Sequence, residues 1–192
     1  LYHQGPVRAL SIASLLTSIS IFSLALLTGL TNPMPFESVE EQISTLVKPV
    51  AKSEDVVSRL VGLLSIILYN NVGVAVRCVV LGFTLVYPLY VLYANGYMLG
   101  SVISFVGYGS LALVPHGIFE LPAIIYSSYL GVKVGFLTLS SIALRALGKR
   151  VTPFPLNQYR ESLSRLSLVL LFLVIAAFIE VFISLPIGYL LR

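Results

Sequence analysis

Four ionisable side chains lie inside long apolar runs of the sequence. They are Arg77, His116, Glu120 and Glu180. A charge within the hydrocarbon of a bilayer is costly unless the group has a partner or takes part in function. These four side chains are therefore the candidate functional residues of the chain.

The spacing of these residues predicts that they meet. His116 and Glu120 are four residues apart, so on a helix they share a face, where the carboxylate can accept a hydrogen bond from the imidazole or hold it protonated. Arg77 and Glu120 each lie about 8 Å from the expected outer ends of their segments, and Glu180 reaches a similar level. The sequence therefore predicts a cation or proton site. A buried charge network that only pins the helices together, with Arg77 neutralising a glutamate, is the alternative.

A tightly held metal is a weaker interpretation of the same residues. His116, Glu120 and Glu180 could offer one nitrogen and two carboxylates, but the HxxxE spacing is non-specific and the HExxH motif of zinc proteases is absent. We therefore expect no metal and no cofactor. The Gly107–Ala112 string resembles a dinucleotide fingerprint but lies in an apolar stretch without a βαβ pattern. No P-loop, serine-protease triad or cysteine nucleophile can be assembled, so an enzyme is not expected.

The composition explains where such a site must lie. Of the 192 residues, 57% are hydrophobic and 10% are charged, whereas a soluble protein has roughly 25% charged residues. A chain of this size cannot hide so much apolar surface, so its solvent must be lipid. The net charge of +4 comes from scattered basic residues that form no stripe for a phosphate backbone, which argues against nucleic acid as a partner.

Long uncharged runs predict an all-α, polytopic membrane helix bundle with about five transmembrane helices, formed by residues 1–192 as a single domain. The clearest crossings are Ala9–Leu30, Val72–Ala94, Val134–Leu147 with its flanks, and Leu166–Leu191. Arg8 and the basic loop at 148–165 indicate a cytoplasmic N-terminus, since short cytoplasmic loops are rich in Lys and Arg. The loop at 31–71 has more acidic than basic residues and suits the outside. We therefore expect a multi-pass protein of the plasma membrane with its C-terminus outside.

The outer loop is predicted to be helical. Ser38–Glu41 fits a capping box, and apolar residues follow at the helical period as far as Leu64. Pro49 divides this pattern, so that a second helix is expected to begin at Ser53. The two pieces either lie along the outer membrane interface as amphipathic helices or pack as a hairpin on the protein.

Several residues mark predicted turns and helix breaks. They are Asn70, Asn71, Asn95, Gly96, Pro115, Gly117 and Pro122. A continuous helix from Pro115 to Leu147 would be about 50 Å long, far beyond the membrane. The pattern therefore favours a broken or re-entrant segment at 115–131, which would place Lys133 at the outer surface. The spacings Gly96/Gly100 and Gly131/Gly135 favour close helix packing or self-association.

Sequence motifs over more than half of the chain resemble the family of stage II sporulation protein M. The most specific is Pro115-His116-Gly117-Ile118-Phe119-Glu120-Leu121-Pro122-Ala123-Ile124-Ile125; weaker ones are Tyr69-Asn70-Asn71-Val72, Asn95-Gly96, Gly131-Val132-Lys133-Val134-Gly135 and Ala176-Ala177-Phe178-Ile179-Glu180. The resemblance implies about five membrane helices and no established enzymatic activity. It also implies, in spore-forming bacteria, a septal-membrane protein that works with peptidoglycan-degrading partners during engulfment. Relatives in organisms without spores imply a more general task.

Two functions are compatible with these features. The first is a channel-like or transporter-like homo-oligomer in the lipid bilayer that passes a cation or small solute. In it, the broken segment lines a polar vestibule, Glu120 and Glu180 attract the cation, His116 tunes the site with pH and Arg77 orients a carboxylate. The second is a scaffold that anchors membrane or envelope-remodelling partners, with structural buried charges.

Overall fold

The chain folds into a bundle of long helices, seen in a computed structural model that describes residues 4–38, 41, 55–149 and 155–184. These residues include five α-helices of 21 residues or more: α1 (Gln4–Thr31), α3 (Val56–Val80), α4 (Val86–Val106), α5 (Val114–Ala146) and α6 (Leu156–Ile179). Three short segments connect or extend them: the 3-10 helices η1 (Gly82–Thr84) and η2 (Gly107–Leu113) and the π-helical segment η3 (Glu180–Ser184). The predicted all-α class is confirmed.

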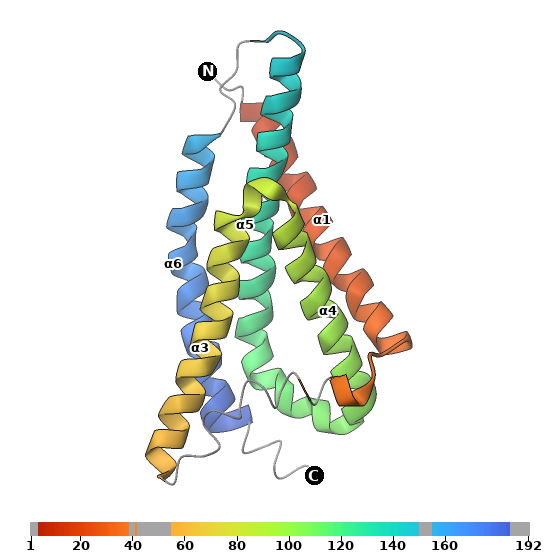
Figure 1. Ribbon diagram of the computed structural model, residues 1–192, viewed down its shortest axis with the longest axis vertical. Coiled ribbons are helices and arrows are strands. Elements are labelled where there is room, and N and C mark those ends of the chain that lie inside the picture. Colours follow the sequence, from red (N-terminus) through yellow and green to blue (C-terminus); the bar gives the residue numbers. More distant parts are fainter. Residues whose placement is uncertain (1–3, 39–40, 42–54, 150–154, 185–192) are drawn as a thin grey trace.

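Four helical stretches among the described residues are long and apolar enough to cross a membrane: Val7–Thr31, Val56–Val80, Val86–Ala146 and Leu156–Ser184. The third is 61 residues long and contains both α4 and α5. The chain reverses its direction at η2, so these two helices lie antiparallel (Figure 1). The described residues thus give four candidate spans, and the five predicted crossings require α4 and α5 within the third to cross separately.

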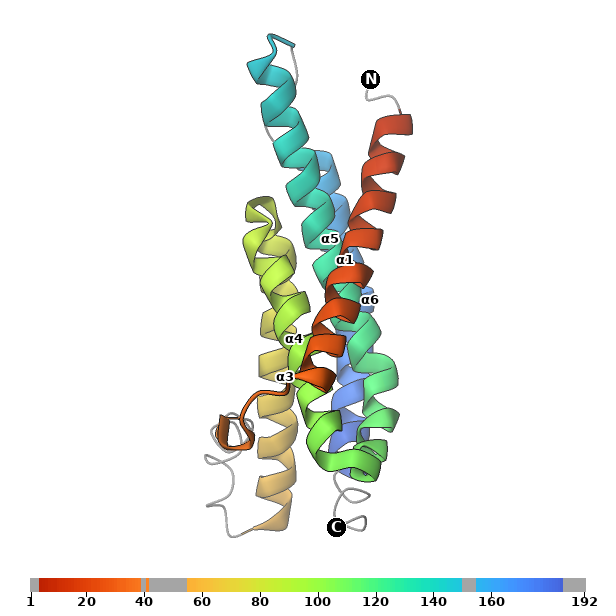
Figure 2. The same cartoon turned by 90° about the vertical axis from the view of Figure 1, so that its right-hand side faces the viewer.

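The helices run alternately in two directions along the long axis of the bundle. α1, α4 and α6 run downward in Figure 1, and α3 and α5 run upward. The η1 connection between α3 and α4 marks one end, called the η1 end, and the η2 connection marks the other, called the η2 end. α5 packs against α3 and α6, while α1 packs along α4 (Figure 2).

An apolar core fills the space between α3, α4, α5 and α6. Its buried members are Ala75, Cys78, Val79, Val91, Ala123, Ile124, Leu130, Leu166, Val169 and Leu173. Many other large apolar side chains point outward, such as Leu16 on α1, Tyr90 on α4 and Leu171 on α6. An apolar surface around a tightly packed apolar core is what a bundle surrounded by lipid requires.

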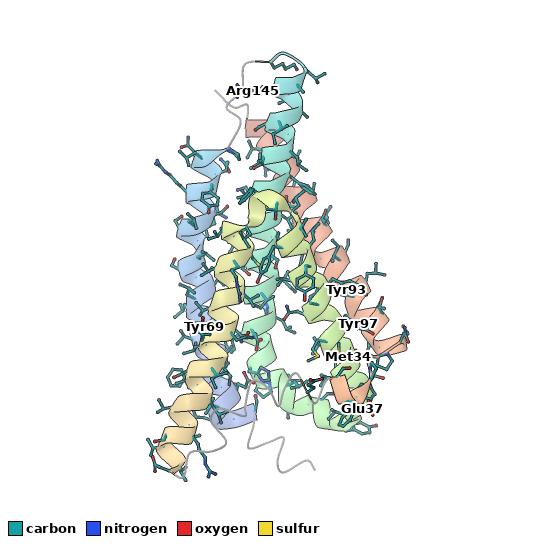
Figure 3. All side chains as sticks on the ribbon, viewed as in Figure 1. Met34, Glu37, Tyr69, Tyr93, Tyr97 and Arg145 are labelled. Atoms are coloured by element: carbon teal, nitrogen blue, oxygen red, sulfur yellow. The ribbon has the colours of Figure 1, made fainter. Side chains whose placement is uncertain are left out.

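The segment after α1 turns back along α4 near the η2 end. The Tyr97 hydroxyl donates a hydrogen bond to the Asn32 carbonyl at 3.1 Å, and the Met34 amide donates to Ser101 Oγ at 3.2 Å. Figure 3 shows Met34 just below Tyr97 of α4, with Glu37 further toward the η2 end. This contact fixes the end of α1 on its neighbour.

The helix breaks predicted at asparagine residues are wrong. Asn70 and Asn71 lie inside α3, and Asn95 and Gly96 lie inside α4. The physical reason is that an asparagine can find its partner within the helix: Asn95 Nδ2 donates to the Val91 carbonyl at 2.8 Å. The chain instead turns between α3 and α4, where Leu85 has a φ of 62°.

The predicted crossing Val72–Ala94 and outer loop 31–71 need the same correction. α3 begins at Val56, and Asp55 caps it, since its carboxylate accepts hydrogen bonds from the amide and hydroxyl of Ser58 at 2.9 and 3.0 Å. These bonds lower the pKa of Asp55 below its usual value. The helix predicted to begin at Ser53 is therefore the start of a crossing and not an interfacial helix. Residues 39–40 and 42–54, which hold most of the first predicted helix, lie outside the described residues.

The predicted break at 115–131 is also wrong, because α5 is a single helix of 33 residues. Pro115 occupies the first turn, where no intrahelical amide is needed, and the helix continues through Gly117 and Pro122. At about 50 Å, α5 extends beyond the bilayer instead of turning back within it. Lys133 is accordingly not at the outer surface: it pairs with Glu161 near the start of α6, toward the η1 end.

Both predicted glycine pairs lie at close helix contacts within the chain. A Cβ at Gly100 would overlap the Leu26 carbonyl of α1, and a Cβ at Gly131 would overlap the Cys78 carbonyl of α3. At Gly96, a Cβ would come within 2.6 Å of the Phe22 carbonyl. The predicted packing use is confirmed. Because both pairs are engaged internally, they give no support to the homo-oligomer, which stays a prediction.

Candidate polar site between two helices

Three of the four candidate residues meet at the η2 end of the bundle. One potential ligand atom from each of His116, Glu120 and Glu180 lies within 4.8 Å of the other two. His116 and Glu120 come from the first turns of α5, and Glu180 from the end of α6. These residues are called the His–Glu–Glu cluster below.

Local helix geometry positions the cluster. His116 and Glu120 share one face of α5 because they are four residues apart. On the other helix, the α-helical turns give way to the π-helical segment η3 at Glu180. Its last residue, Ser184, is 4% exposed and lies with its Oγ 2.9 Å from His116 Nδ1. The widened turn thus brings both Glu180 and Ser184 against the start of α5.

The two ring nitrogens of His116 differ in their hydrogen bonding. Its Nδ1 is hydrogen-bonded to Ser184, while Nε2 lies 4.0 Å from Glu120 Oε2, too far for a hydrogen bond. The side chains of His116 and Glu120 are 12% and 22% exposed. The cluster is therefore largely enclosed, with part of the His116 and Glu120 side chains still exposed.

Asn71 supplies a partner from a third helix. Its side chain is a hydrogen-bonding partner of Glu120, and its Oδ1 accepts from Asn70 Nδ2 at 3.2 Å. An ionised carboxylate only accepts hydrogen bonds, so the Asn71 amide nitrogen is the group that can donate to Glu120. The predicted cap residues Asn70 and Asn71 therefore belong to the surroundings of the cluster.

Arg77 does not belong to the cluster, contrary to the sequence prediction. It lies about 9 Å further along α3 than Asn71, toward the η1 end. Its Nε donates to the Gly73 carbonyl at 2.9 Å, and its guanidinium lies 5.9 Å from the ring centre of Tyr87. Among the described residues, no ion pair joins it to a glutamate. The error arose because Asn71 was taken as the outer end of a helix.

A second polar group lies nearer the η1 end, and we call it the Lys133 network. Lys133 Nζ lies 3.8 Å from Glu161 Oε2, and Arg165 Nη2 donates to Glu161 Oε1 at 2.6 Å. Arg165 Nη1 also donates to the Tyr126 hydroxyl at 3.3 Å. Lys133 is almost fully buried, with a side chain 7% exposed. The sequence does not predict this network, because a broken segment at 115–131 would place Lys133 at the other end of the bundle.

Ser184 and Asn71 were not predicted to take part in the cluster as it is observed. The spacing of Ser184 in the sequence could have indicated its part. Ser184 lies four residues after Glu180, so helical spacing alone predicts that both face the same neighbour. For Asn71 no comparable signal exists, since its part depends on the pairing of α3 with α5. Of the remaining predicted break residues, Pro115 and Gly117 flank His116 in the first turn of α5, and Pro122 follows Glu120.

The chemistry available to the cluster is that of cation or proton binding. Two carboxylates and one imidazole offer oxygen and nitrogen lone pairs, and they converge without a lysine or arginine in ion-pair contact with the glutamates among the described residues. Like charges a few ångströms apart require a proton or a cation between them.

The chain matches a known protein family. Residues 11–185 match the family described as Stage II sporulation protein M. No curated protein and no solved structure matches the chain.

Proposed function

The chain belongs to the stage II sporulation protein M family, and from this premise we propose that it is a multi-pass scaffold that anchors partner proteins at the cell membrane. The single observation that supports the proposal is that tightly packed apolar side chains separate the two polar groups of the bundle. The apolar core fills the space between the His–Glu–Glu cluster at one end and the Lys133 network at the other. A solute passing between α3, α5 and α6 would have to displace this core. Envelope-remodelling proteins are the partners that the family suggests.

In a scaffold of this kind, the polar groups fasten the helices to one another. The His–Glu–Glu cluster joins α5 to α6 and, through Asn71, to α3. The Lys133 network joins α5 to α6 at the other end. A bundle fastened at both ends presents a rigid surface to a partner, since its helices cannot slide past one another.

Ion flux tests the proposal. Purified protein reconstituted into liposomes is expected to give no flux of protons, Na⁺ or divalent cations above that of protein-free liposomes, and Glu120→Gln is expected to behave in the same way. The matched control is Glu37→Gln, because Glu37 is exposed and is not a member of the cluster. Flux through the parent protein that falls in Glu120→Gln but persists in Glu37→Gln would contradict the scaffold.

That contrary outcome would identify the second candidate function, a cation channel or transporter. The observation in its favour is the His–Glu–Glu cluster itself, because two adjacent, partly exposed carboxylates near one end of the bundle suit the binding of a cation. In this case the apolar core is the barrier that must open during transport. The unbroken α5 removes the re-entrant vestibule from this mechanism.

The proposal includes an orientation, with the η2 end outside the cell and the η1 end in the cytoplasm. Two exposed residues test it: Tyr108 in η2 is 92% exposed, and Leu147, just after α5, is 76% exposed. In a Cys78→Ser background, Tyr108→Cys is expected to react with a membrane-impermeant maleimide in intact cells. Leu147→Cys is expected to react only after the cells are opened. The opposite pattern would show that the bundle is inverted.

A further inference from the structure

We propose that the His–Glu–Glu cluster binds one first-row divalent transition-metal ion, such as Zn²⁺ or Mn²⁺, between α5 and η3. His116 Nε2 and one oxygen each from Glu120 and Glu180 are the protein ligands. The site stands whether the protein is a scaffold or a transporter, because it concerns binding and not passage. It reverses the expectation from the sequence, where HxxxE spacing alone was too common to indicate a metal.

The distances between the potential ligand atoms suit a shared ion. The three atoms lie within 4.8 Å of one another, and His116 Nε2 is 4.0 Å from Glu120 Oε2. A metal ion bonded at about 2.0–2.2 Å to nitrogen and carboxylate oxygen holds pairs of its ligands about 3–4 Å apart. A small contraction of the side chains therefore closes the site around an ion. One nitrogen and two oxygens are a ligand set for Zn²⁺ or Mn²⁺ and less suited to Ca²⁺, which takes oxygen alone.

The second independent observation is the support around these ligands. A metal-binding histidine usually has its other ring nitrogen engaged by a hydrogen-bonding partner, which fixes the tautomer and the ring orientation. His116 Nδ1 has such a partner in the buried Ser184 hydroxyl, which leaves Nε2, 4.0 Å from Glu120 Oε2, as the nitrogen available to an ion. The Asn71 side chain is placed to stabilise the Glu120 carboxylate. These contacts restrain two of the three side chains whose ligand atoms lie within 4.8 Å of one another.

Charge favours an ion of charge +2. Glu120 and Glu180 together carry two negative charges when ionised, and with Arg77 elsewhere on α3, His116 is the one basic side chain in contact with them among the described residues. A divalent cation with a neutral imidazole balances this charge completely. His116 and Glu120 are partly exposed, so an ion can reach them, and the three protein ligands leave a coordination position for water.

Metal binding to the detergent-purified full chain tests the site. The protein, freed of any histidine tag and treated with a chelator, is titrated with Zn²⁺ by calorimetry and with Co²⁺ by visible absorption. We expect one ion per chain and a rise in melting temperature with Zn²⁺. Glu180→Gln and His116→Ala are each expected to weaken binding by at least about 10-fold, and Ser184→Ala by about 10-fold through loss of orientation.

Glu37→Gln is the matched control and is expected to bind as the parent does, since this exposed carboxylate lies outside the cluster. If the well-folded parent protein bound no stoichiometric metal ion, the proposal would be overturned. A proton shared between the Glu120 and Glu180 carboxylates would then reduce their repulsion instead. Unchanged binding in both Glu180→Gln and His116→Ala would also overturn the proposal. Neither result depends on ion flux through liposomes. Failure of the metal-site proposal can therefore be distinguished from failure of the scaffold proposal.

Discussion

Replacing Gly131 with alanine is expected to lower the free energy of unfolding by about 2 kcal/mol, because the added methyl group has no space. A Cβ at this position overlaps the Cys78 carbonyl of α3 and comes within 3.1 Å of Pro88 Cβ on α4. The obstacle on the α3 side is backbone, which cannot rotate away as a side chain can. Three helices must therefore separate, and the loss of packing outweighs the gain of about 1 kcal/mol that alanine brings to a helix.

Thiol labelling measures this effect at the site of the change. Cys78 is the single cysteine of the chain and is fully buried beside Gly131. Its reaction with a maleimide in mild detergent reports how often the α3–α5 contact opens. A loss of about 2 kcal/mol corresponds to opening that is about 30-fold more frequent. We therefore expect labelling of Gly131→Ala to be faster by about that factor.

Gly117→Ala is the matched control, because Gly117 lies in the same helix but meets a neighbouring atom only at the ordinary contact distance of 3.8 Å, the Leu121 Cδ1. This substitution is expected to leave Cys78 labelling unchanged or to slow it slightly. Equal labelling rates for Gly131→Ala and the parent would show that α3 and α5 do not approach as closely as described.

The number and type of helices could be predicted from the sequence, but their ends could not. Long apolar runs determine that the chain crosses a membrane several times. Within such a run, however, no change of polarity marks a turn. The turn between α3 and α4 lies in an apolar stretch around Leu85, a residue type that gives no signal for a positive φ. The asparagines that did offer a signal lie within helices instead.

The candidate site could also be predicted only in part, because the depth of a residue in the bundle was counted from predicted helix ends. His116 and Glu120 are related by helical spacing alone, so their placement on one face was secure. Glu180 was placed at their level by counting from the cytoplasmic end of its helix, and the structure brings it there. Arg77 was placed by counting from Asn71, which is not a helix end, so its depth was wrong. The depth of a residue along a helix can be predicted only when the helix end from which the residues are counted is correct.

The Lys133 network shows why an overlong helix is not evidence for a break. A lysine near the centre of Pro115–Leu147 was expected to be incompatible with one continuous helix. α5 instead places Lys133 beside Glu161 and extends beyond it past the η1 end, where the span no longer needs to match the hydrocarbon (Figure 1). The position of the charge is set by its partner on α6.

The partner on α6 leads to the second prediction. Glu161→Gln is expected to lower the free energy of unfolding by about 1–2 kcal/mol, because it leaves the buried ammonium of Lys133 without its counter-charge. The value is below that of a fully buried pair, since the Glu161 side chain is 37% exposed and water screens part of the interaction. Thermal unfolding in detergent, followed by circular dichroism, measures the change.

Lys133→Met is expected to have a much smaller effect, within about 1 kcal/mol of the parent, since an apolar side chain of similar length fills the same buried space. The double variant Lys133→Met with Glu161→Gln is then expected to recover most of the stability that Glu161→Gln loses. Arg165→Gln serves as the control for the exposed part of the network, because the Arg165 and Glu161 side chains are 47% and 37% exposed and such pairs contribute at most about 1 kcal/mol. If Lys133→Met destabilised the protein as much as Glu161→Gln, the ammonium group itself would be required at this position, and the network would be more than a counter-charge for a buried lysine.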